Sequence, residues 1–361
     1  MAVPKLRFKE FDADYTNTTF EKLKGFSIQS GKSEEKGDTG EFPFYGSTGV
    51  IGYKDIFDYE GKSILIARVG ANAGSLYQID GKYSVSDNTL RLTVSDDTSL
   101  DYLRELLIKF NLNRLVFGTG QPLVTGGMIK KVNIFIPEFT EQTKIASFLS
   151  NVDEKISQLT QKHELLNQYK QGMMQKLFSQ EIRFKADDGS EFGEWEISKF
   201  DEVLSTISIR NNQIQASQIL EEGDIPVIDQ GQKYIAGYTQ VISKILEPKS
   251  GLIIFGDHTT FLKYVDFSFV VGADGVKVLE VEKNSLSKYV YYYLCHNKLQ
   301  PEGYKRHFTI LREIEILVPC LAEQTKIANF LSAIDQKIEV VAQQIEQAKT
   351  WKKGLLQQMF I

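Results

Sequence analysis

Residues 25–33, GFSIQSGKS, come nearest in this chain to a motif with known chemistry, the glycine-rich loop that cradles phosphates. That motif has four residues between its glycines and follows a buried strand, because the chain must turn tightly from strand into helix. Here five residues separate Gly25 from Gly31, and the preceding TTFEKLK does not resemble a buried strand. The sequence therefore disfavours nucleotide binding.

Nucleophilic and metal chemistry are also poorly supported. Asp257-His258-Thr259 places an acid beside a histidine, but no GxSxG turn presents a serine. The four histidines form no HExxH motif and no pair at zinc-ligand spacing. The Asn/Asp-Pro-Pro-Tyr element of amino-methylating enzymes does not occur. The sequence predicts a binding protein without a catalytic site.

Two basic segments indicate a different chemistry, contact with nucleic acid. Residues 101–131 and 298–312 each carry a net charge of +3, whereas the whole chain carries −5. Lysine commonly holds phosphates, and arginine and glutamine form paired hydrogen bonds with guanine and adenine edges. The alternative is that both segments are ordinary solvated loops.

A long internal repeat predicts two helices, each of which follows a region that contains one of these basic segments. Residues 141–178 and 323–360 align at a constant offset of 182, with 18 identical residues in 38 positions. Both copies carry apolar residues at alternating spacings of three and four, which is typical of a coiled-coil helix. We expect the two helices to pack antiparallel within the chain with pseudo-twofold symmetry. Pairing between two chains is the alternative.

A further apolar row lies beside this seam and predicts a surface for a partner protein. Contact with the chain's own globules would explain it equally well. The row consists of Phe148, Tyr169, Met174, Phe330, Trp351 and Leu356.

Each helix follows a globule of mixed character, and the repeat extends weakly into both globules. Short apolar, β-branched runs predict strands, and longer amphipathic runs predict helices. The strands are SILIARVG, GLIIFGD, NIFIP and EILVP, and the helices are SLDYLRELLIKFNL and SLSKYVYYYLCHNKL. The expected fold is α+β, with globules at residues 1–136 and 181–318 and long helices at 137–180 and 319–361.

Composition limits the cellular setting. Only two cysteines occur in 361 residues, no apolar leader opens the chain, and no apolar run approaches the ~20 residues of a membrane span. We expect a cytoplasmic protein.

The paired segments IPEFTEQTKIASFLSNVDEKI and VPCLAEQTKIANFLSAIDQKI resemble the specificity subunit of type I restriction–modification systems. PKLRF, FGEWE and GDHTTFLKYVDFSFVVGADGVKVL extend the resemblance over the whole chain. Tyr15 departs from it, because the second half has Trp195 at the matching position.

The resemblance implies two target-recognition domains that read a bipartite DNA sequence and a chain that is not itself an enzyme. It implies that the helices recruit two methyltransferase subunits, with S-adenosylmethionine bound on those subunits. Motor–nuclease subunits, which use ATP and Mg, would complete the restriction complex. A coiled-coil adaptor with two protein-binding globules is the alternative function.

We expect DNA contacts from loops at matching places in the two globules. The first choices in the first globule are Gly118, Thr119, Gly120, Gln121, Thr125, Lys130 and Lys131. Their counterparts in the second globule are Lys305, Arg306, His307, Thr309 and Arg312. Second choices, which end or follow inner strands, are Arg68, Asn72, Asp257, His258, Thr260 and Lys263. Because the two loops differ, we expect the two half-sites to differ.

Overall fold

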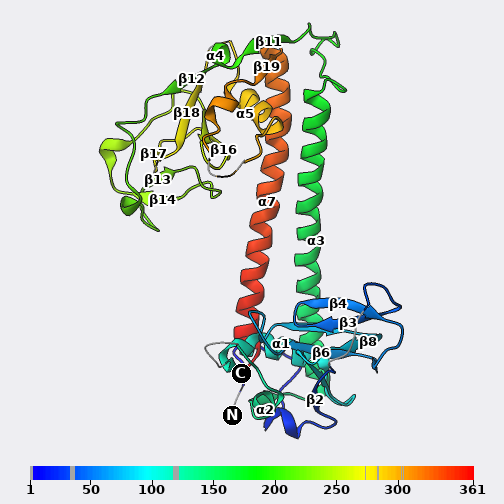
Figure 1. The fold of residues 1–361 in the computed structure, drawn as a ribbon. Coiled ribbons are helices and arrows are strands. Elements are labelled where there is room, and N and C mark those ends of the chain that lie inside the picture. The colour runs from blue at the N-terminus through cyan, green and yellow to red at the C-terminus, as the bar shows by residue number, and fades with distance from the viewer. Residues whose placement is uncertain are drawn as a thin grey trace. The chain divides into compact units, whose positions relative to one another are not determined.

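The computed structural model describes residues 3–32, 37–116, 122–272, 274–282, 284–301, 303 and 305–361 (Figure 1). The chain divides into two compact units. Unit 1 comprises residues 1–161 and 342–361, and unit 2 comprises residues 162–341. Each unit therefore contains one globule, the first half of one long helix and the last half of the other.

Unit 1 is built on two four-stranded sheets. The first has the order β2 (Ser27–Ser30), β9 (Thr89–Thr93), β6 (Ser63–Ala67), β7 (Leu76–Ile79). The second has the order β4 (Gly49–Lys54), β3 (Phe42–Gly46), β8 (Lys82–Val85), β5 (Tyr59–Glu60). The strand β6 is buried along its whole length, which explains its continuous apolar sequence. The helical elements are η1 (Phe20–Lys22), α1 (Leu100–Phe110), η2 (Leu112–Leu115) and α2 (Gly126–Lys130).

Unit 2 repeats this arrangement. Its first sheet has the order β12 (Leu204–Ile207), β18 (Val276–Val281), β15 (Leu252–Gly256), β16 (Leu262–Val265). Its second sheet has the order β14 (Gly237–Thr239), β13 (Ile225–Ile228), β17 (Val270–Val271). The helical elements are α4 (Phe200–Val203), η3 (Ala216–Gln218), η4 (Ile242–Lys244), α5 (Ser287–His296) and α6 (Phe308–Leu311). In each second sheet one strand pair is parallel, β3 with β8 and β13 with β17.

An antiparallel strand pair closes each globule immediately before its long helix. β1 (Thr16–Thr19) pairs with β10 (Asn133–Ile136), and β11 (Glu196–Lys199) pairs with β19 (Glu315–Val318). The closing strands NIFIP and EILVP were predicted from the sequence, and both predictions are confirmed.

The two long helices are α3 (Phe139–Phe178) and α7 (Leu321–Met359). In unit 1 the Nζ atom of Lys352 lies 2.6 Å from Asp153, and in unit 2 the Nζ atom of Lys170 lies 2.6 Å from Asp335. Rising numbers along α3 thus meet falling numbers along α7, so the helices are antiparallel within the chain (Figure 1). The predicted intramolecular pairing is confirmed, and the two ion pairs occupy equivalent positions of the repeat.

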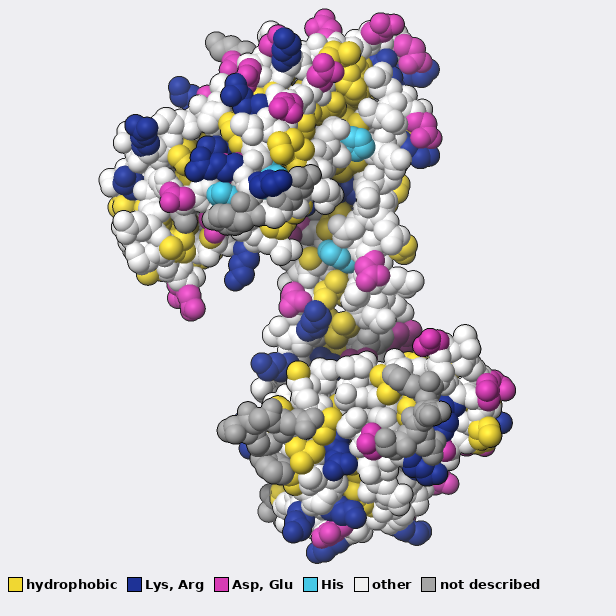
Figure 2. Space-filling view, in the orientation of Figure 1, with side chains coloured by type: hydrophobic (Ala, Val, Ile, Leu, Met, Phe, Trp, Pro, Cys, Tyr) yellow, Lys and Arg dark blue, Asp and Glu magenta, His cyan; other side chains and the backbone are white. Residues whose placement is uncertain are grey.

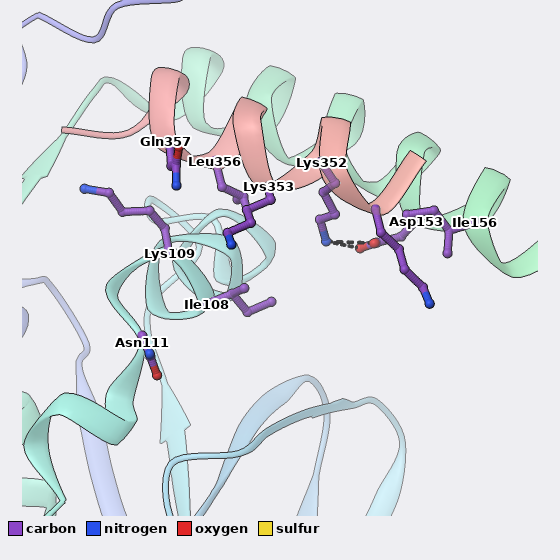
Figure 3. A pocket seen from close by; sticks show the side chains of 10 residues that line it. Ile108, Lys109, Asn111, Asp153, Ile156, Lys352, Lys353, Leu356 and Gln357 are labelled. Atoms are coloured by element: carbon purple, nitrogen blue, oxygen red, sulfur yellow. Dashed lines mark hydrogen bonds and ion pairs between the residues drawn. The ribbon is translucent and has the colours of Figure 1, made fainter. Parts of the chain in front are cut away.

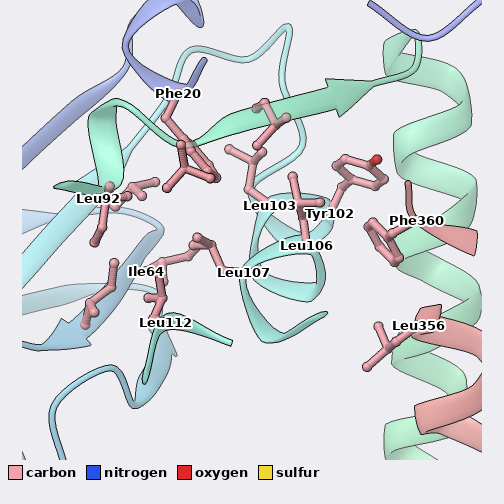
Figure 4. Close-up of a cluster of buried hydrophobic side chains, with 14 of the residues drawn as sticks. Phe20, Ile64, Leu92, Tyr102, Leu103, Leu106, Leu107, Leu112, Leu356 and Phe360 are labelled. Atoms are coloured by element: carbon pink, nitrogen blue, oxygen red, sulfur yellow. The ribbon is translucent and has the colours of Figure 1, made fainter. Parts of the chain in front are cut away.

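Helix ends complete the core of each unit. In unit 1 the ring of Phe360, just beyond the end of α7, packs on Tyr102 of α1 with centroids 5.0 Å apart (Figure 4). In unit 2 the equivalent Phe178 of α3 packs on Tyr289 of α5 at 5.9 Å. All four rings are buried. Burial of such aromatic groups stabilises the contact between these helix ends and the globules.

Candidate nucleic-acid interface

In unit 1, a buried carboxylate at the start of α3 joins that helix to the N-terminal segment of the globule. Arg7 donates hydrogen bonds from Nε and Nη2 to the two oxygens of Glu141, at 2.8 and 2.7 Å. The hydroxyl of Tyr15 donates to the same carboxylate at 3.1 Å. Burial and the Glu141 charge raise the pKa of Tyr15, so this hydroxyl remains a donor at neutral pH.

Unit 2 contains the equivalent cluster. Arg183 donates to both oxygens of Glu323 at 3.0 and 2.7 Å, and Trp195 Nε1 donates at 3.0 Å. Tyr15 of unit 1 thus takes the place of Trp195, because both side chains combine a buried ring with one donor. We call the trios Arg7–Tyr15–Glu141 and Arg183–Trp195–Glu323 the clasps of units 1 and 2.

The glutamine that follows each clasp carboxylate positions the recognition-domain helix. Gln142 accepts from the backbone N–H of Ser99, and Gln324 accepts from that of Leu286. Ser99 and Leu286 are the N-cap residues of α1 and α5. The repeated Glu-Gln pair is therefore a structural device, and its position tells nothing about which bases are read.

In unit 2 the structure brings together the two loops that the sequence singled out. The backbone N–H of His307 donates to the carbonyl of Asp257 at 2.9 Å, and that of Phe308 donates to the Asp257 side chain at 2.9 Å. His258 Nδ1 lies 3.2 Å from the carbonyl oxygen of Lys305. The turn after β15 and the segment before α6 therefore form one surface, which we call the unit 2 loop pair (residues 257–260 and 305–309).

The equivalent loops also meet in unit 1. The backbone N–H of Val124 donates to the carbonyl of Arg68 at 2.9 Å, as His307 does to Asp257. The turn after β6 also contains Asn72, which is exposed. We call residues 68–74 and 122–125 the unit 1 loop pair. The predicted contacts Gly118, Thr119, Gly120 and Gln121 lie outside the described residues.

Exposure separates the predicted DNA contacts into two groups. The exposed or half-buried members are Arg68, Asn72, Thr125, Lys130, Lys131, His258, Lys305, Arg306, Thr309 and Arg312. Thr125 also caps α2 by accepting from the backbone N–H of Met128. Arg312 forms a bidentate pair with Asp201, and both side chains are at least half exposed. Figure 2 shows basic and histidine side chains gathered on the face of unit 2 that is in view.

Four of the predicted contacts are buried in the structure. The exposed fractions of Asp257, Thr260, Lys263 and His307 are 4, 1, 4 and 1%. Lys263 donates to the carbonyl of Asp229 at 2.8 Å, and burial lowers its pKa while Asp229 opposes that shift. These side chains hold the loops from within, so direct contact with bases is not expected of them.

Sequence reasoning missed Gln230, which links the unit 2 loop pair to the second sheet. Its side chain accepts from the backbone N–H of His258 at 3.3 Å and donates to the carbonyl of Asp274 at 2.9 Å. The backbone carbonyl of Gln230 accepts a hydrogen bond from Thr259 Oγ1 at 2.5 Å. The only available signal was a polar residue two positions after a buried strand, which is common and does not identify such a link.

The predicted partner surface divides in the same way. Tyr169 and Trp351 occupy equivalent helix positions and are 51 and 54% exposed. Phe148 packs edge-on against Trp351 at 6.0 Å, and Phe330 packs against Phe184 at 5.7 Å. The other two members, Met174 and Leu356, are each only 8% exposed and belong to the cores of their units. Their burial leaves little side-chain surface for a partner protein.

Each half of the duplicated architecture is similar to a known protein family. Residues 19–168 and 193–350 match the family described as Type I restriction modification DNA specificity domain. The chain belongs to this family. One match falls on each globule and most of the long helix that follows it, so the internal repeat is a repeat of the family's domain.

Relatives and solved structures agree with this assignment. The chain is 28% identical over 337 residues to the specificity subunit of the type I restriction enzyme MjaVIII of Methanocaldococcus jannaschii, covering 81% of this chain and 77% of that protein. It is 31% identical over 163 residues to the EcoR124I/EcoR124II specificity subunit of Escherichia coli, covering 40 and 38%. The crystal structure of a type I S subunit from M. genitalium has the same fold, with a TM-score of 0.70, 18% identity and coverage of 100 and 99%.

Family membership confirms the expected role, a non-catalytic specificity subunit that recognises DNA. It also confirms the predicted fold of two α+β domains with two long helices. Within the described part of the chain, no helix is long and apolar enough to span a membrane.

Proposed function

We propose that each globule reads one half of a bipartite DNA sequence and that the bases between the two halves are not read. The main support is the recurrence of one loop arrangement, because each unit joins the turn after an inner strand to the segment before its closing strand. Residues 1–136 and 181–318 are the proposed recognition domains, and residues 137–180 and 319–361 are the proposed spacer helices. The cytoplasm is the proposed location.

The exposed or half-buried side chains of the two loop pairs are the proposed DNA contacts. In unit 1 these are Arg68, Asn72 and Thr125, with Lys130 and Lys131 nearby, and in unit 2 they are His258, Lys305, Arg306 and Thr309. Arginine and asparagine suit guanine and adenine edges, whereas lysine suits phosphates. Since the two sets differ in residue type, the two half-sites differ in sequence.

A domain exchange tests this division of labour. Replacing residues 10–136 by the first recognition domain of another family member is expected to change one half of the methylated sequence and leave the other half unchanged. The measurement is methylome sequencing of a host that expresses the hybrid with its methyltransferase. The matched hybrid, with residues 190–318 exchanged, is expected to change only the other half. Alteration of both halves by either hybrid would refute the proposal.

The long helices are proposed to recruit two methyltransferase subunits, which bind S-adenosylmethionine and methylate adenine. Motor–nuclease subunits, with ATP and Mg, are proposed to complete the complex. Exposed apolar residues at equivalent helix positions support two similar docking surfaces. They are Tyr169 and Trp351, together with Phe139 and Leu321 at the helix starts, which are 44 and 51% exposed.

Replacing both Tyr169 and Trp351 by serine is expected to weaken methyltransferase binding at least tenfold while leaving the fold intact. Truncation of an aromatic hot-spot residue at a protein interface costs about 2 kcal/mol or more. Titration calorimetry of the purified chain with the methyltransferase measures the effect. The control is Ile56→Ser, because Ile56 is 75% exposed but lies outside the helices. If both variants bound the methyltransferase equally well, Tyr169 and Trp351 would not belong to the interface.

The alternative, a coiled-coil adaptor without a DNA role, makes a different prediction for salt. Binding that neutralises phosphates weakens steeply with salt, because condensed counterions are released. DNA affinity that ignores salt concentration would favour the adaptor.

A further inference from the structure

A cavity of about 550 Å³ in unit 1 lies between the end of α7 and the end of α1. Its apolar lining comes from Ile108, Ile156 and Leu356, and four lysines surround it. Figure 3 shows Lys353 extending from α7 toward α1, between Lys109 and Lys352. The remaining lysine is Lys349, one helical turn before Lys353 on the same face of α7.

The four lysines differ in how far their charges are compensated. Lys352 is held by Asp153 at 2.6 Å and by the buried Glu105 at 3.0 Å. Lys109 donates to the carbonyl oxygen of Ile361 at 2.7 Å, and burial followed by the Arg114 charge lowers its pKa.

Two of the four charges remain available to a ligand. Lys349 makes only a solvent-exposed pair with Glu346 at 2.9 Å, and such pairs contribute little. Lys353 forms no ion pair with the described parts of the chain. The cavity therefore presents two cations, from Lys349 and Lys353, above an apolar base.

Unit 2 contains the equivalent cavity, which is lined by Lys170 and the exposed Lys298 but has no lysine at the two positions that match Lys349 and Lys353. It has a volume of about 730 Å³ and lies between the end of α3 and the end of α5. At the repeat offset of 182, Asn167 replaces Lys349 and Gln171 replaces Lys353, whereas Lys170 matches Lys352. Packing alone thus does not require lysine at the two positions, since the same fold forms with amide side chains there.

The unit 1 cavity is linked to the unit 1 loop pair through the end of α1 and through η2. Asn111, which lines the cavity, ends α1 in the left-handed conformation with φ of 59° and leads into η2. In η2, Asn113 contacts the turn after β6 so closely that a Cβ atom on Gly74 would lie 2.5 Å from its Oδ1. The backbone of a duplex seated on the loop pair would have to extend past Asn113 and Asn111 to reach Lys349 and Lys353.

We propose that the unit 1 cavity holds a DNA backbone phosphate through Lys349 and Lys353, as a sequence-independent anchor that unit 2 lacks. The inference rests on the proposed reading of DNA by the loop pairs. Lysine binds phosphate as a point charge and adds affinity without base preference. The first recognition domain consequently supplies more of the salt-dependent binding energy than the second.

The test transfers the unit 2 residues into unit 1, in the double variant Lys349→Asn, Lys353→Gln. The full chain, assembled with its methyltransferase subunits, is titrated with cognate and non-cognate duplexes across a salt series. The slope of log K against log salt is expected to fall in magnitude by about 1 to 2, equally for both duplexes. The methylated sequence is expected to remain unchanged.

The reverse variant, Asn167→Lys, Gln171→Lys, is expected to steepen the slope by a similar amount. An unchanged slope in the first variant overturns the inference, and so does loss of methyltransferase assembly at unchanged slope, which would make the cavity a protein contact. Failure of the proposed function itself is distinguishable, because the unmodified complex would then show no preference for the cognate duplex.

Discussion

Replacing Glu323 by alanine is expected to lower the free energy of unfolding of unit 2 by about 3 kcal/mol. The Glu323 side chain is fully buried and accepts hydrogen bonds from both Arg183 and Trp195. Its loss leaves a guanidinium group and an indole N–H without their acceptor, and unmet buried polar groups cost more than the bond itself gained. Urea denaturation followed by tryptophan fluorescence measures the change, because Trp195 is the only tryptophan of unit 2.

Two controls make this result specific. Glu141→Ala removes the clasp of unit 1 and is expected to destabilise that unit by a similar amount, as reported by Trp351, the other tryptophan of the chain. Asp187→Ala removes an exposed partner of Lys326 and is expected to change neither unit measurably. If Glu323→Ala behaved like Asp187→Ala, the clasp would not stabilise the fold.

The long helices and the α+β class could be predicted because their signals are local or repeated. Heptad spacing around Ile145 and Ile327 shows which face of each helix is apolar, and the constant offset shows that the two faces are alike. The partner of a buried group is not encoded locally. Glu141 meets Arg7, which is 134 residues away, so the role of the repeated Glu-Gln pair appeared only in the structure.

The exposure of the predicted DNA contacts could not be read from the sequence for a related reason. Polar residue type indicates hydrogen-bonding capacity but not exposure, and a buried strand end can direct a polar side chain inward. Asp257, Lys263 and His307 have suitable chemistry for DNA, yet they stabilise the turn after β15 and its neighbour from inside. Nothing in the sequence around His258 and Lys305 shows that these neighbouring side chains are more accessible to solvent. Only the folded structure shows which polar side chains are buried.

The equivalent lysines of the two helices are expected to respond unequally to the same substitution. Lys352→Met is expected to destabilise unit 1 by about 3 kcal/mol, and Lys170→Met to destabilise unit 2 by about 1 kcal/mol. Both lysines pair with the aspartate of the other helix. They differ in their third neighbour, which is Glu105 for Lys352 and Tyr292 for Lys170.

That third neighbour determines how much stability each substitution is expected to remove. Glu105 is 3% exposed and pairs with both Arg104 and Lys352. Removal of Lys352 therefore leaves the buried Glu105 carboxylate paired with Arg104 alone among these two cations. In unit 2 the Tyr292 hydroxyl donates to Asp335 at 2.6 Å, and the Asp335 side chain is 38% exposed. Water and a neutral donor therefore continue to solvate that carboxylate when Lys170 is absent.

A double-mutant cycle tests this explanation directly. Adding Glu105→Gln to Lys352→Met removes the stranded charge and is expected to restore at least half of the lost stability, measured by urea denaturation with Trp351 fluorescence. Equal losses for the two single methionine variants would show that the helix–helix ion pair, common to both units, carries the energy. In that case the buried glutamate would have no special role.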